Sequence, residues 1–354
     1  MAGTAAAGLS SEASSAGPPE IVNQSNMAKL VAAFGSSHST MQFSSVEHWV
    51  EMFDHVDRRA PIVDFDGVPR SYDEIVQSRP ADAEARIAPK MQTERHAATW
   101  RAMDRVGAAI AEAKLDVLVI VGDDQREIFK DNCRPAIGIY YGETIRNAAA
   151  PQPPPADWYT RDQHKRMEES QDAHYRCHVG LGLHLIEGLS ARDFDITAVK
   201  ALVGEQYEGH SYSFFHRRYL AGASLPIVPV FLNTYYPPNQ PTPQRCVDLG
   251  IAIRELIASF PQDLRVGIAA SGGLSHFLVN EALDQKIIEA VRRKDVKALA
   301  ALSPRHLQSG SSEIRNWICV TAAVRDLKLD WMEYVPAYRS RALTGVGLGF
   351  AAWS

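Results

Sequence analysis

The sequence predicts an α/β fold, in which a central, mostly parallel or mixed sheet is flanked by helices, and two observations predict it. The first is a set of four short apolar runs, rich in valine and isoleucine, with the composition of buried strands. They occupy residues 29–34, 115–121, 225–232 and 264–270. The second is that segments of helical length and periodicity separate these runs. Strands that alternate with helices are typical of α/β folds, where ligands bind at the carboxyl ends of the strands.

Each predicted strand runs directly into a polar turn. The turn sequences are GSSH at residues 35–38, GDDQ at 122–125, NTYYPPNQP at 233–241 and SGGLSH at 271–276. Because the carboxyl ends of parallel strands meet at one edge of a sheet, these turns are expected to lie together. Three of them would bring a histidine or a polar amide to that edge, which is therefore the predicted place of a functional site.

The predicted helices begin with an insertion at residues 40–112, between the first two strands. Ser71 and Glu74 have the spacing of a capping box, and apolar residues recur at helical intervals over residues 84–115. This helical insertion lies near the predicted site, where it forms either a lid or an ordinary layer packed on the sheet. Residues 149–157 have the composition of a stiff polyproline linker. The other expected helices occupy residues 174–189, 244–259, 280–293 and 312–327.

Length and composition limit the functional classes. With 354 residues, 45% of them hydrophobic, the chain can bury a large core, and we expect its main domain at residues 27–354 after a disordered tail at 1–26. Acidic and basic residues are interspersed around a formal net charge of -5, which argues against a nucleic-acid partner. No apolar stretch approaches the roughly 20 residues that span a bilayer, so no membrane partner is expected.

The cysteines and the N-terminal segment predict a cellular location. The four cysteines are far apart and form no CxxC pair, so neither a zinc knuckle nor a redox dithiol is indicated, and buried free thiols in a reducing compartment are the simplest interpretation. The first residues lack the basic start and apolar run of a secretion signal. A cytoplasmic protein is therefore expected. Dinucleotide, phosphate-loop and nucleophile-elbow signatures are absent from the sequence.

Two histidines and one glutamate are candidates for chemistry. His38 ends a Gly-Ser-Ser turn, but a lone histidine in a loop is more often not a ligand. His276 follows two glycines that let the backbone turn sharply beside a ligand, and a histidine near pH 7 can carry a proton; a hydrogen bond to a neighbouring turn is the alternative. Glu313 opens a predicted helix that Ser311 or Ser312 would cap. The first helical turn would keep this carboxylate ionised, and on Glu313 alone a simple charge partner for the helix is favoured.

Two further places carry polar groups of interest. Asp123 and Asp124 end the second predicted strand, where they would either bind or orient a metal ligand or cap the turn. The stretch GHSYSFFHRR brings together His210, Arg217 and Arg218. It combines a proton donor with cations that can hold a carboxylate through a planar fork, and a solvated basic stretch is the equally weighted alternative.

Several motifs in a common order resemble the class III extradiol dioxygenases, the family typified by the beta subunit of protocatechuate 4,5-dioxygenase. The motifs are SSH at His38, D-x-x-x-x-F at Asp124 and Phe129, PQDLRVGIAASGGLSH at His276, and SGS followed by E-x-x-x-W at Glu313 and Trp317. The resemblance extends from about residue 28 to the C-terminus, apart from the insertion. The segments GDDQ, SGGLSHF and SEIRNW are most similar to the single-chain branch of 3-O-methylgallate 3,4-dioxygenase type.

This resemblance implies a catalytic domain that uses iron(II) and O2 to open the ring of a small catechol-type aromatic acid, such as 3-O-methylgallate, gallate or protocatechuate. It places His38 and Glu313 on two of the three iron ligands and His276 on the catalytic acid/base. His210 falls on the second active-site histidine, beside the substrate. The insertion would then cover the site, a role that a separate small chain plays in the two-subunit enzymes of the family.

One position departs from the family pattern. Gln125 stands where the family supplies its second ligand histidine, and it offers only a neutral amide oxygen to a metal. Three outcomes follow: Gln125 coordinates anyway, Asp123 or Asp124 takes over, or redox activity is lost. The third iron ligand is expected at or near Gln125.

Other assignments stay open at this stage. Arg217, Arg218 or Arg339 would hold the substrate carboxylate, and Asp124 is a further candidate for substrate contact. A non-redox binding or scaffold protein on the same fold is one alternative function, and a metal-dependent hydrolase is another. A homo-oligomer is compatible with the sequence.

Overall fold

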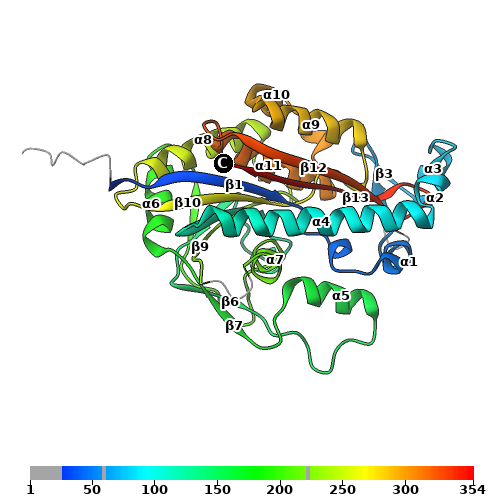
Figure 1. The fold of residues 1–354 in the computed structure, drawn as a ribbon, viewed down its shortest axis with the longest axis horizontal. Helices are drawn as coiled ribbons and strands as arrows, with labels where there is room; N and C mark the ends of the chain where they lie inside the picture. Colours follow the sequence, from blue (N-terminus) through cyan, green and yellow to red (C-terminus); the bar gives the residue numbers. More distant parts are fainter. Residues whose placement is uncertain (1–25, 58–60, 221–223) are drawn as a thin grey trace, which may run out of the picture.

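The structure is a computed structural model, and it describes residues 26–57, 61–220 and 224–354. Apart from Asn26, the expected tail at residues 1–26 lies outside the described residues. Figure 1 shows a central twisted sheet with helices on both of its faces. The predicted α/β fold is therefore confirmed, and the sheet is mixed.

Four adjacent parallel strands form the centre of the sheet, and they are the four runs that the sequence predicts. In spatial order they are β1 (Lys29–Ser36), β10 (Arg265–Ser271), β4 (Val117–Asp123) and β9 (Ile227–Leu232). Their side chains are almost entirely buried because helices cover both faces, which explains why each run is continuously apolar instead of alternating. All four strands point the same way, so their carboxyl ends meet at one edge.

Further strands extend this centre on both sides, and the two that border it pair with it in the antiparallel direction. Next to β1 lies β13 (Thr344–Trp353), which pairs with β12 (Leu329–Tyr338) and with the short β11 (His276–Leu278). On the other side β9 pairs with β5 (Ile137–Tyr140), which in turn pairs with β8 (Ile196–Val199). The sheet thus has nine strands within the described residues, five more than the sequence predicts.

Helices cover both faces of the sheet, and each face has its own set. One face carries α6 (Val179–Ser190), α8 (Pro243–Ala258), α9 (Glu281–Arg293), α10 (Val296–Ala300) and α11 (Ile314–Ala323). The other face carries α1 (Val46–Val56), α4 (Pro89–Ala113), α5 (Trp158–Met167) and α7 (His210–Arg218). The predicted helices at residues 244–259 and 280–293 are confirmed as α8 and α9.

Two predicted helices need correction. Residues 174–189 are not one helix, because their first part forms β7 (Ala173–Arg176), which pairs with β6 (Thr144–Asn147); only the remainder belongs to α6. Residues 312–327 begin instead as the 3-10 turn η4 (Ser309–Glu313) and continue as α11, which ends at Ala323. The proline-rich residues 149–157 connect β6 to α5.

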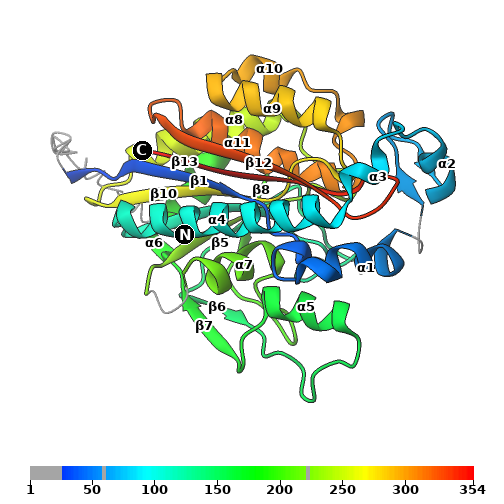
Figure 2. The same ribbon diagram turned by 45° about the vertical axis from the view of Figure 1, so that its right-hand side comes forward.

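The insertion contains more than helices. After the 3-10 turn η2 (Thr40–Gln42) and α1, it forms a small hairpin of β2 (Ile62–Val63) and β3 (Pro69–Arg70), then α2 (Tyr72–Gln77) and α3 (Ala83–Arg86). The predicted capping box of α2 is present: the Ser71 hydroxyl accepts from the backbone of Glu74, whose carboxylate accepts from the backbone of Ser71. The long α4 lies along the sheet in Figures 1 and 2, so this part of the insertion is a packed layer.

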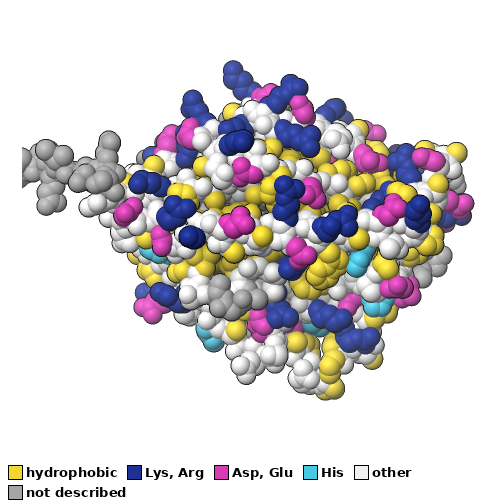
Figure 3. All heavy atoms as spheres, viewed as in Figure 1, with side chains coloured by type: hydrophobic (Ala, Val, Ile, Leu, Met, Phe, Trp, Pro, Cys, Tyr) yellow, Lys and Arg dark blue, Asp and Glu magenta, His cyan; other side chains and the backbone are white. Residues whose placement is uncertain are grey.

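The surface charges, the helices and the cysteines can be compared with the composition of the sequence. Figure 3 shows basic and acidic side chains interspersed across the displayed face. Within the part of the chain that the structure describes, no helix is both long and apolar enough to cross a membrane. All four cysteines are free thiols, but Cys133 is exposed, which corrects the expectation that all of them are buried.

Candidate active site

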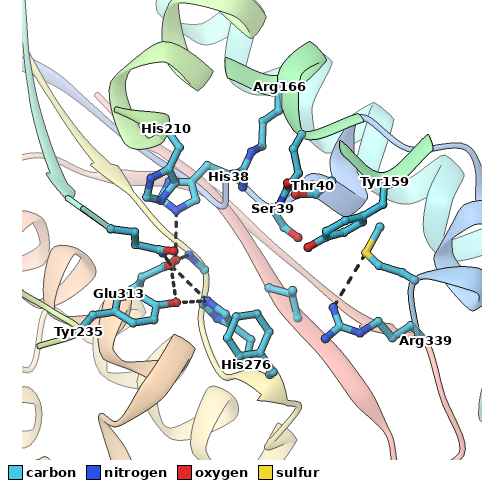
Figure 4. Close-up of a pocket in the computed structure, with 16 residues that line it drawn as sticks. His38, Ser39, Thr40, Tyr159, Arg166, His210, Tyr235, His276, Glu313 and Arg339 are labelled. Carbon is cyan, nitrogen blue, oxygen red and sulfur yellow. Dashed lines mark hydrogen bonds and ion pairs between the residues drawn. The ribbon is translucent and has the colours of Figure 1, made fainter. Parts of the chain in front are cut away.

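The carboxyl edge of the four parallel strands gathers the polar groups of the candidate site. His38 follows β1, Asp123 is the last residue of β4, and His276 begins β11 just beyond β10. Glu313 ends η4, and His210 is the first residue of α7. Figure 4 shows the side chains of His38, His210, His276 and Glu313 converging from separate elements on one pocket.

Four of these residues can hold a metal ion together. One ligand atom from each of His38, Asp123, His210 and Glu313 lies within 4.8 Å of the others, and all four side chains are buried. His38 Nε2 is 3.3 Å from Glu313 Oε2 and 3.9 Å from Asp123 Oδ1. His210 Nε2 is 3.6 Å from Asp123 Oδ2. The two imidazole rings meet edge to face, with centroids 4.5 Å apart.

Neighbouring groups fix the orientation of these side chains. Ser271 Oγ lies 2.9 Å from His38 Nδ1, and the Glu127 carboxylate lies 2.5 Å from His210 Nδ1. Both rings therefore present Nε2 to the cluster, and neither Nε2 atom has a hydrogen-bond partner among the described residues. Hydrogen bonds that hold the far nitrogen of a histidine are typical of metal sites. The backbone amide of Gly273 donates to Glu313 Oε2 at 2.7 Å.

The cluster has a definite pattern of charge. Burial lowers the pKa of His38, the Glu313 carboxylate opposes this shift, and the neighbouring His210 adds to it. Burial raises the pKa of Asp123, and the Glu313 carboxylate raises it further. Burial opposes the ionisation of Glu313, but His276 and His38 hold its pKa well below the usual value. Burial likewise opposes the charge on His210, yet Glu127 and Asp123 raise its pKa to about 9.

Glu313 differs in one respect from its predicted setting. The sequence predicts it in the first turn of a helix that Ser311 or Ser312 caps, with the helix keeping it ionised. Neither serine caps α11: the Ser311 hydroxyl bonds the backbone of His276, and the Ser312 hydroxyl has no partner in the described chain. Its two histidine neighbours, and not a helix cap, hold the pKa of this carboxylate below the usual value.

His276 lies beside the cluster. Its Nδ1 is 2.9 Å from the carbonyl oxygen of Leu274, and its Nε2 is 3.2 Å from Glu313 Oε1. The Tyr235 hydroxyl donates to the same Glu313 oxygen at 3.2 Å and lies 3.4 Å from His276 Nε2. Burial lowers the pKa of His276, but the Glu313 carboxylate outweighs burial and raises it. His276 can therefore accept and return a proton at the pocket.

In the GDDQ turn, one side chain faces the pocket and another caps the turn. Gln125 lines the pocket, and its amide nitrogen lies 3.3 Å from both Asp123 Oδ2 and Glu313 Oε1. Asp124 is turned away, because its carboxylate accepts the backbone amides of Arg126, Ile128 and Phe129. The structure therefore places Asp124 as the cap of this turn and not at the pocket.

The three arginines expected to hold a substrate carboxylate occupy different places. Arg217 pairs with Glu169 and Arg218 pairs with Asp104, and neither lines the pocket. Arg339 does line the pocket, but Asp57 already holds its guanidinium.

Several pocket residues are not among those that the sequence predicts. Tyr235 belongs to the turn after β9, whose position at the strand edge was the available signal. Tyr159, Gln163 and Arg166 come from α5. Nothing in the sequence marks α5 as part of the site, since it is polar and follows the proline-rich segment. The insertion contributes Thr40 and Met52 to the pocket wall, along with Ser39 just before it.

Comparison with known proteins shows which family the chain belongs to. Residues 85–350, more than half of the chain, match the family model described as the catalytic LigB subunit of aromatic ring-opening dioxygenase. This range includes Asp123, His210, His276 and Glu313, and the fold adds His38 from outside it. Gallate dioxygenase of Pseudomonas putida is 34% identical over 101 residues, which are 28% of this chain and 28% of that protein. The match thus spans little more than a quarter of that relative. The chain belongs to the family of catalytic subunits of aromatic ring-opening dioxygenases.

Proposed function

We propose that this protein is an iron(II)-dependent dioxygenase that performs extradiol cleavage of a catechol-type aromatic acid, with 3-O-methylgallate, gallate and protocatechuate as the candidate substrates. The observation that carries this proposal is the buried cluster of His38, Asp123, His210 and Glu313, whose donor atoms lie within 4.8 Å of one another beside His276. The family match supports a ring-opening dioxygenase, and the pocket above the cluster has room for a small ring between several elements.

The donor set fits a divalent cation. Two buried carboxylates face each other, and two buried histidine nitrogens point at them without hydrogen-bond partners in the described chain. Buried charge of one sign is costly unless it is compensated, and a metal ion would compensate it. Mixed imidazole and carboxylate ligands suit iron(II), and several other divalent metals accept the same ligands. We propose iron because the family reaction uses O2.

We assign His38 and Glu313 as two of the metal ligands, with Asp123 as the third. Gln125 presents an amide nitrogen, which carries two hydrogens and cannot coordinate, so it would become a ligand only if its amide turned over. Asp123 replaces it as the nearest oxygen donor on the same strand end. An iron(II) ion held there would supply the redox chemistry that O2 requires and would favour the deprotonated form of a catechol hydroxyl.

His276 would act as the acid/base. It would accept a proton from a substrate hydroxyl and later return it, because its Nε2 lies at the pocket and the Glu313 carboxylate stabilises its protonated form. His210 would sit beside the substrate as a proton donor, with Glu127 balancing its charge. Both atoms of O2 enter the product, and the ring bond that breaks lies next to the diol, not between its hydroxyls.

An oxygen-electrode screen of anaerobically iron-loaded protein tests this proposal. We expect uptake of O2 with protocatechuate, gallate or 3-O-methylgallate, in a 1:1 ratio to the substrate consumed, and a product opened beside the diol. Metal analysis of anaerobically purified protein, before any iron is added, tests the alternatives: bound zinc without O2 uptake would point to a hydrolase, and protein that binds no metal would point to a non-redox binding role. Either result would end the proposal.

A further inference from the structure

Two cationic side chains other than histidine line the pocket within the described residues, Arg166 and Arg339. Figure 4 shows them on different walls: Arg166 reaches toward His38 from α5, and Arg339 lies on the side away from the metal cluster. Their partners differ in a way that separates their roles.

Arg339 is already neutralised. Its Nε and Nη2 atoms donate to the two oxygens of Asp57 at 3.0 and 2.7 Å, so the edge of the guanidinium that best matches a carboxylate is occupied. Both side chains are buried, and Thr344 also donates to Asp57 at 2.6 Å. This pair has no charge left for a substrate anion.

The charge of Arg166, in contrast, is not neutralised by a carboxylate within the described residues. Its Nη1 donates to the backbone carbonyl of His38 at 2.8 Å, and its Nη2 meets only the Met167 sulfur, a weak acceptor, at 3.5 Å. Its buried Nε has no hydrogen-bond partner in the described chain, where no carboxylate pairs with Arg166 either. The same Nε and Nη2 edge that Asp57 occupies in Arg339 is therefore left without a carboxylate.

This lack of an anion is unusual among the enclosed arginines of this protein. Arg217, Arg218 and Arg134 each pair with a carboxylate. Arg315 has none, but its guanidinium donates to the backbone carbonyls of Pro241, Leu307 and other residues. Arg166 alone of these combines a place on the pocket wall with an unbalanced charge. Taking a cation out of water is costly unless an anion compensates it.

We propose that Arg166 is the residue that binds the carboxylate of the substrate and so selects acidic catechols over neutral ones. The inference rests on the proposed function and deepens it. A carboxylate at this guanidinium would receive charge-assisted hydrogen bonds, while the diol of the same ring faces the cluster of His38, Asp123 and Glu313. It also replaces Arg217, Arg218 and Arg339 in the role for which the sequence nominated them.

A second role for Arg166 must be separated from this one. Its bond to the His38 carbonyl could position the backbone beside a metal ligand, in which case its loss would impair every substrate alike. A matched ligand pair distinguishes the two: 3,4-dihydroxybenzoate and 3,4-dihydroxybenzamide have nearly the same shape, and only the first carries a charge.

The experiment compares wild-type protein with Arg166→Gln, Arg166→Lys and the control Lys165→Gln. Lys165 is the next residue of α5, it is exposed, and it pairs with Asp162 outside the pocket, so its replacement removes an equal charge without touching the site. Affinity for both ligands is measured by anaerobic calorimetry on iron-loaded protein, together with bound iron and the kcat and KM of each ligand.

We expect wild-type and Lys165→Gln protein to prefer the acid, and Arg166→Gln to lose about ten- to a hundredfold in affinity and KM for the acid while the amide changes less than about twofold. Arg166→Lys should recover part of the preference, since it keeps the charge but not the fork. Equal losses for acid and amide, or unchanged preference for the acid, would overturn the inference. If the acid preference depends on Arg166 but neither ligand is turned over, the proposed function fails and the binding role stands.

Discussion

Close contacts with glycine hold His276 in place. An added Cβ on Gly310 would lie 2.0 Å from His276 Cδ2 and 2.5 Å from Cγ, far inside any normal contact. We predict that Gly310→Ala displaces the imidazole by about an ångström and lowers kcat by about a hundredfold. The fold should survive, with a stability loss of about 1–3 kcal/mol.

A matched variant controls for the change of glycine to alanine itself. Gly107 lies in α4, where an added Cβ would meet Tyr219 at an ordinary 3.7 Å. Gly107→Ala should keep wild-type turnover and gain up to about 1 kcal/mol of stability, because alanine favours a helix. Steady-state kinetics and urea unfolding measure both variants, and wild-type kcat in Gly310→Ala would refute the positioning argument.

The chemistry of His276 permits a simpler test. In His276→Phe the ring volume is similar but no proton can be carried, so we expect bound iron to stay at the wild-type level and O2 uptake to fall to background. Metal analysis and the oxygen electrode measure the two quantities on the same sample. Oxygen uptake like that of the wild type would remove His276 from the mechanism.

At the level of single residues, the sequence predicts the main chemical groups of the site but not the residues that orient them. His38, His276 and Glu313 come from different turns, and the fold brings them together because the strands before them are parallel neighbours. Glu127 and Ser271, which orient the two cluster histidines, carry no local signal. Arg166 was also missed, because the lack of a partner is visible only in three dimensions.

Close packing of α8 against α11 helps to position Glu313, the site residue directly before α11. An added Cβ on Gly250 in α8 would lie 2.0 Å from the Cys319 carbonyl oxygen in α11, so the two backbones approach closely. We predict that Gly250→Ala lowers the free energy of unfolding by about 1–3 kcal/mol or more and reduces activity, since Glu313 directly precedes α11.

Gly188 provides the comparison for this prediction. Its added Cβ would meet Leu256 Cδ2 at 2.1 Å, but that atom ends a flexible side chain that can rotate away. Gly188→Ala should therefore cost less stability than Gly250→Ala in parallel urea titrations. Equal losses in the free energy of unfolding for the two variants would show that the helix backbones separate easily and that the close approach at Gly250 is unimportant.

Elements were predictable where their pattern was strong. The four parallel strands are continuously apolar, and their ends agree with the structure to about two residues. In contrast, β13 carries glycines at 345, 347 and 349, which weaken any strand signal. At Gly345 and Gly347 an added Cβ would collide with the Ala337 carbonyl and the Asp284 carboxylate, and at Gly349 it would be a tight 3.1 Å from the Trp317 ring. Tertiary packing therefore determines this strand more than its local sequence does.

The whole molecule should respond to metal through its stability. Two carboxylates and two histidines converge in the buried cluster, so the folded state should bind a divalent cation far better than the unfolded chain does. We predict that iron(II) at about a hundred times its dissociation constant stabilises the protein by about 2.7 kcal/mol. Anaerobic thermal unfolding with and without metal measures this, and chelator should reverse it.

The variant Asp123→Asn separates metal binding from ordinary packing. It removes one of two facing buried carboxylates, so the chelator-treated variant should have a higher Tm than chelator-treated wild type. Its Tm should no longer rise with iron(II), because the third ligand is lost. A variant that keeps the full iron-dependent rise would show that Asp123 is not a ligand.

Iron-edge anomalous diffraction from crystals of anaerobically iron(II)-loaded protein tests the central claim most directly. We predict one strong peak within coordination distance of His38 Nε2 and the Glu313 carboxylate, with Asp123 as the third protein ligand and His276 near but not bound. A peak elsewhere, or none at these side chains in protein that carries full iron, would contradict the account.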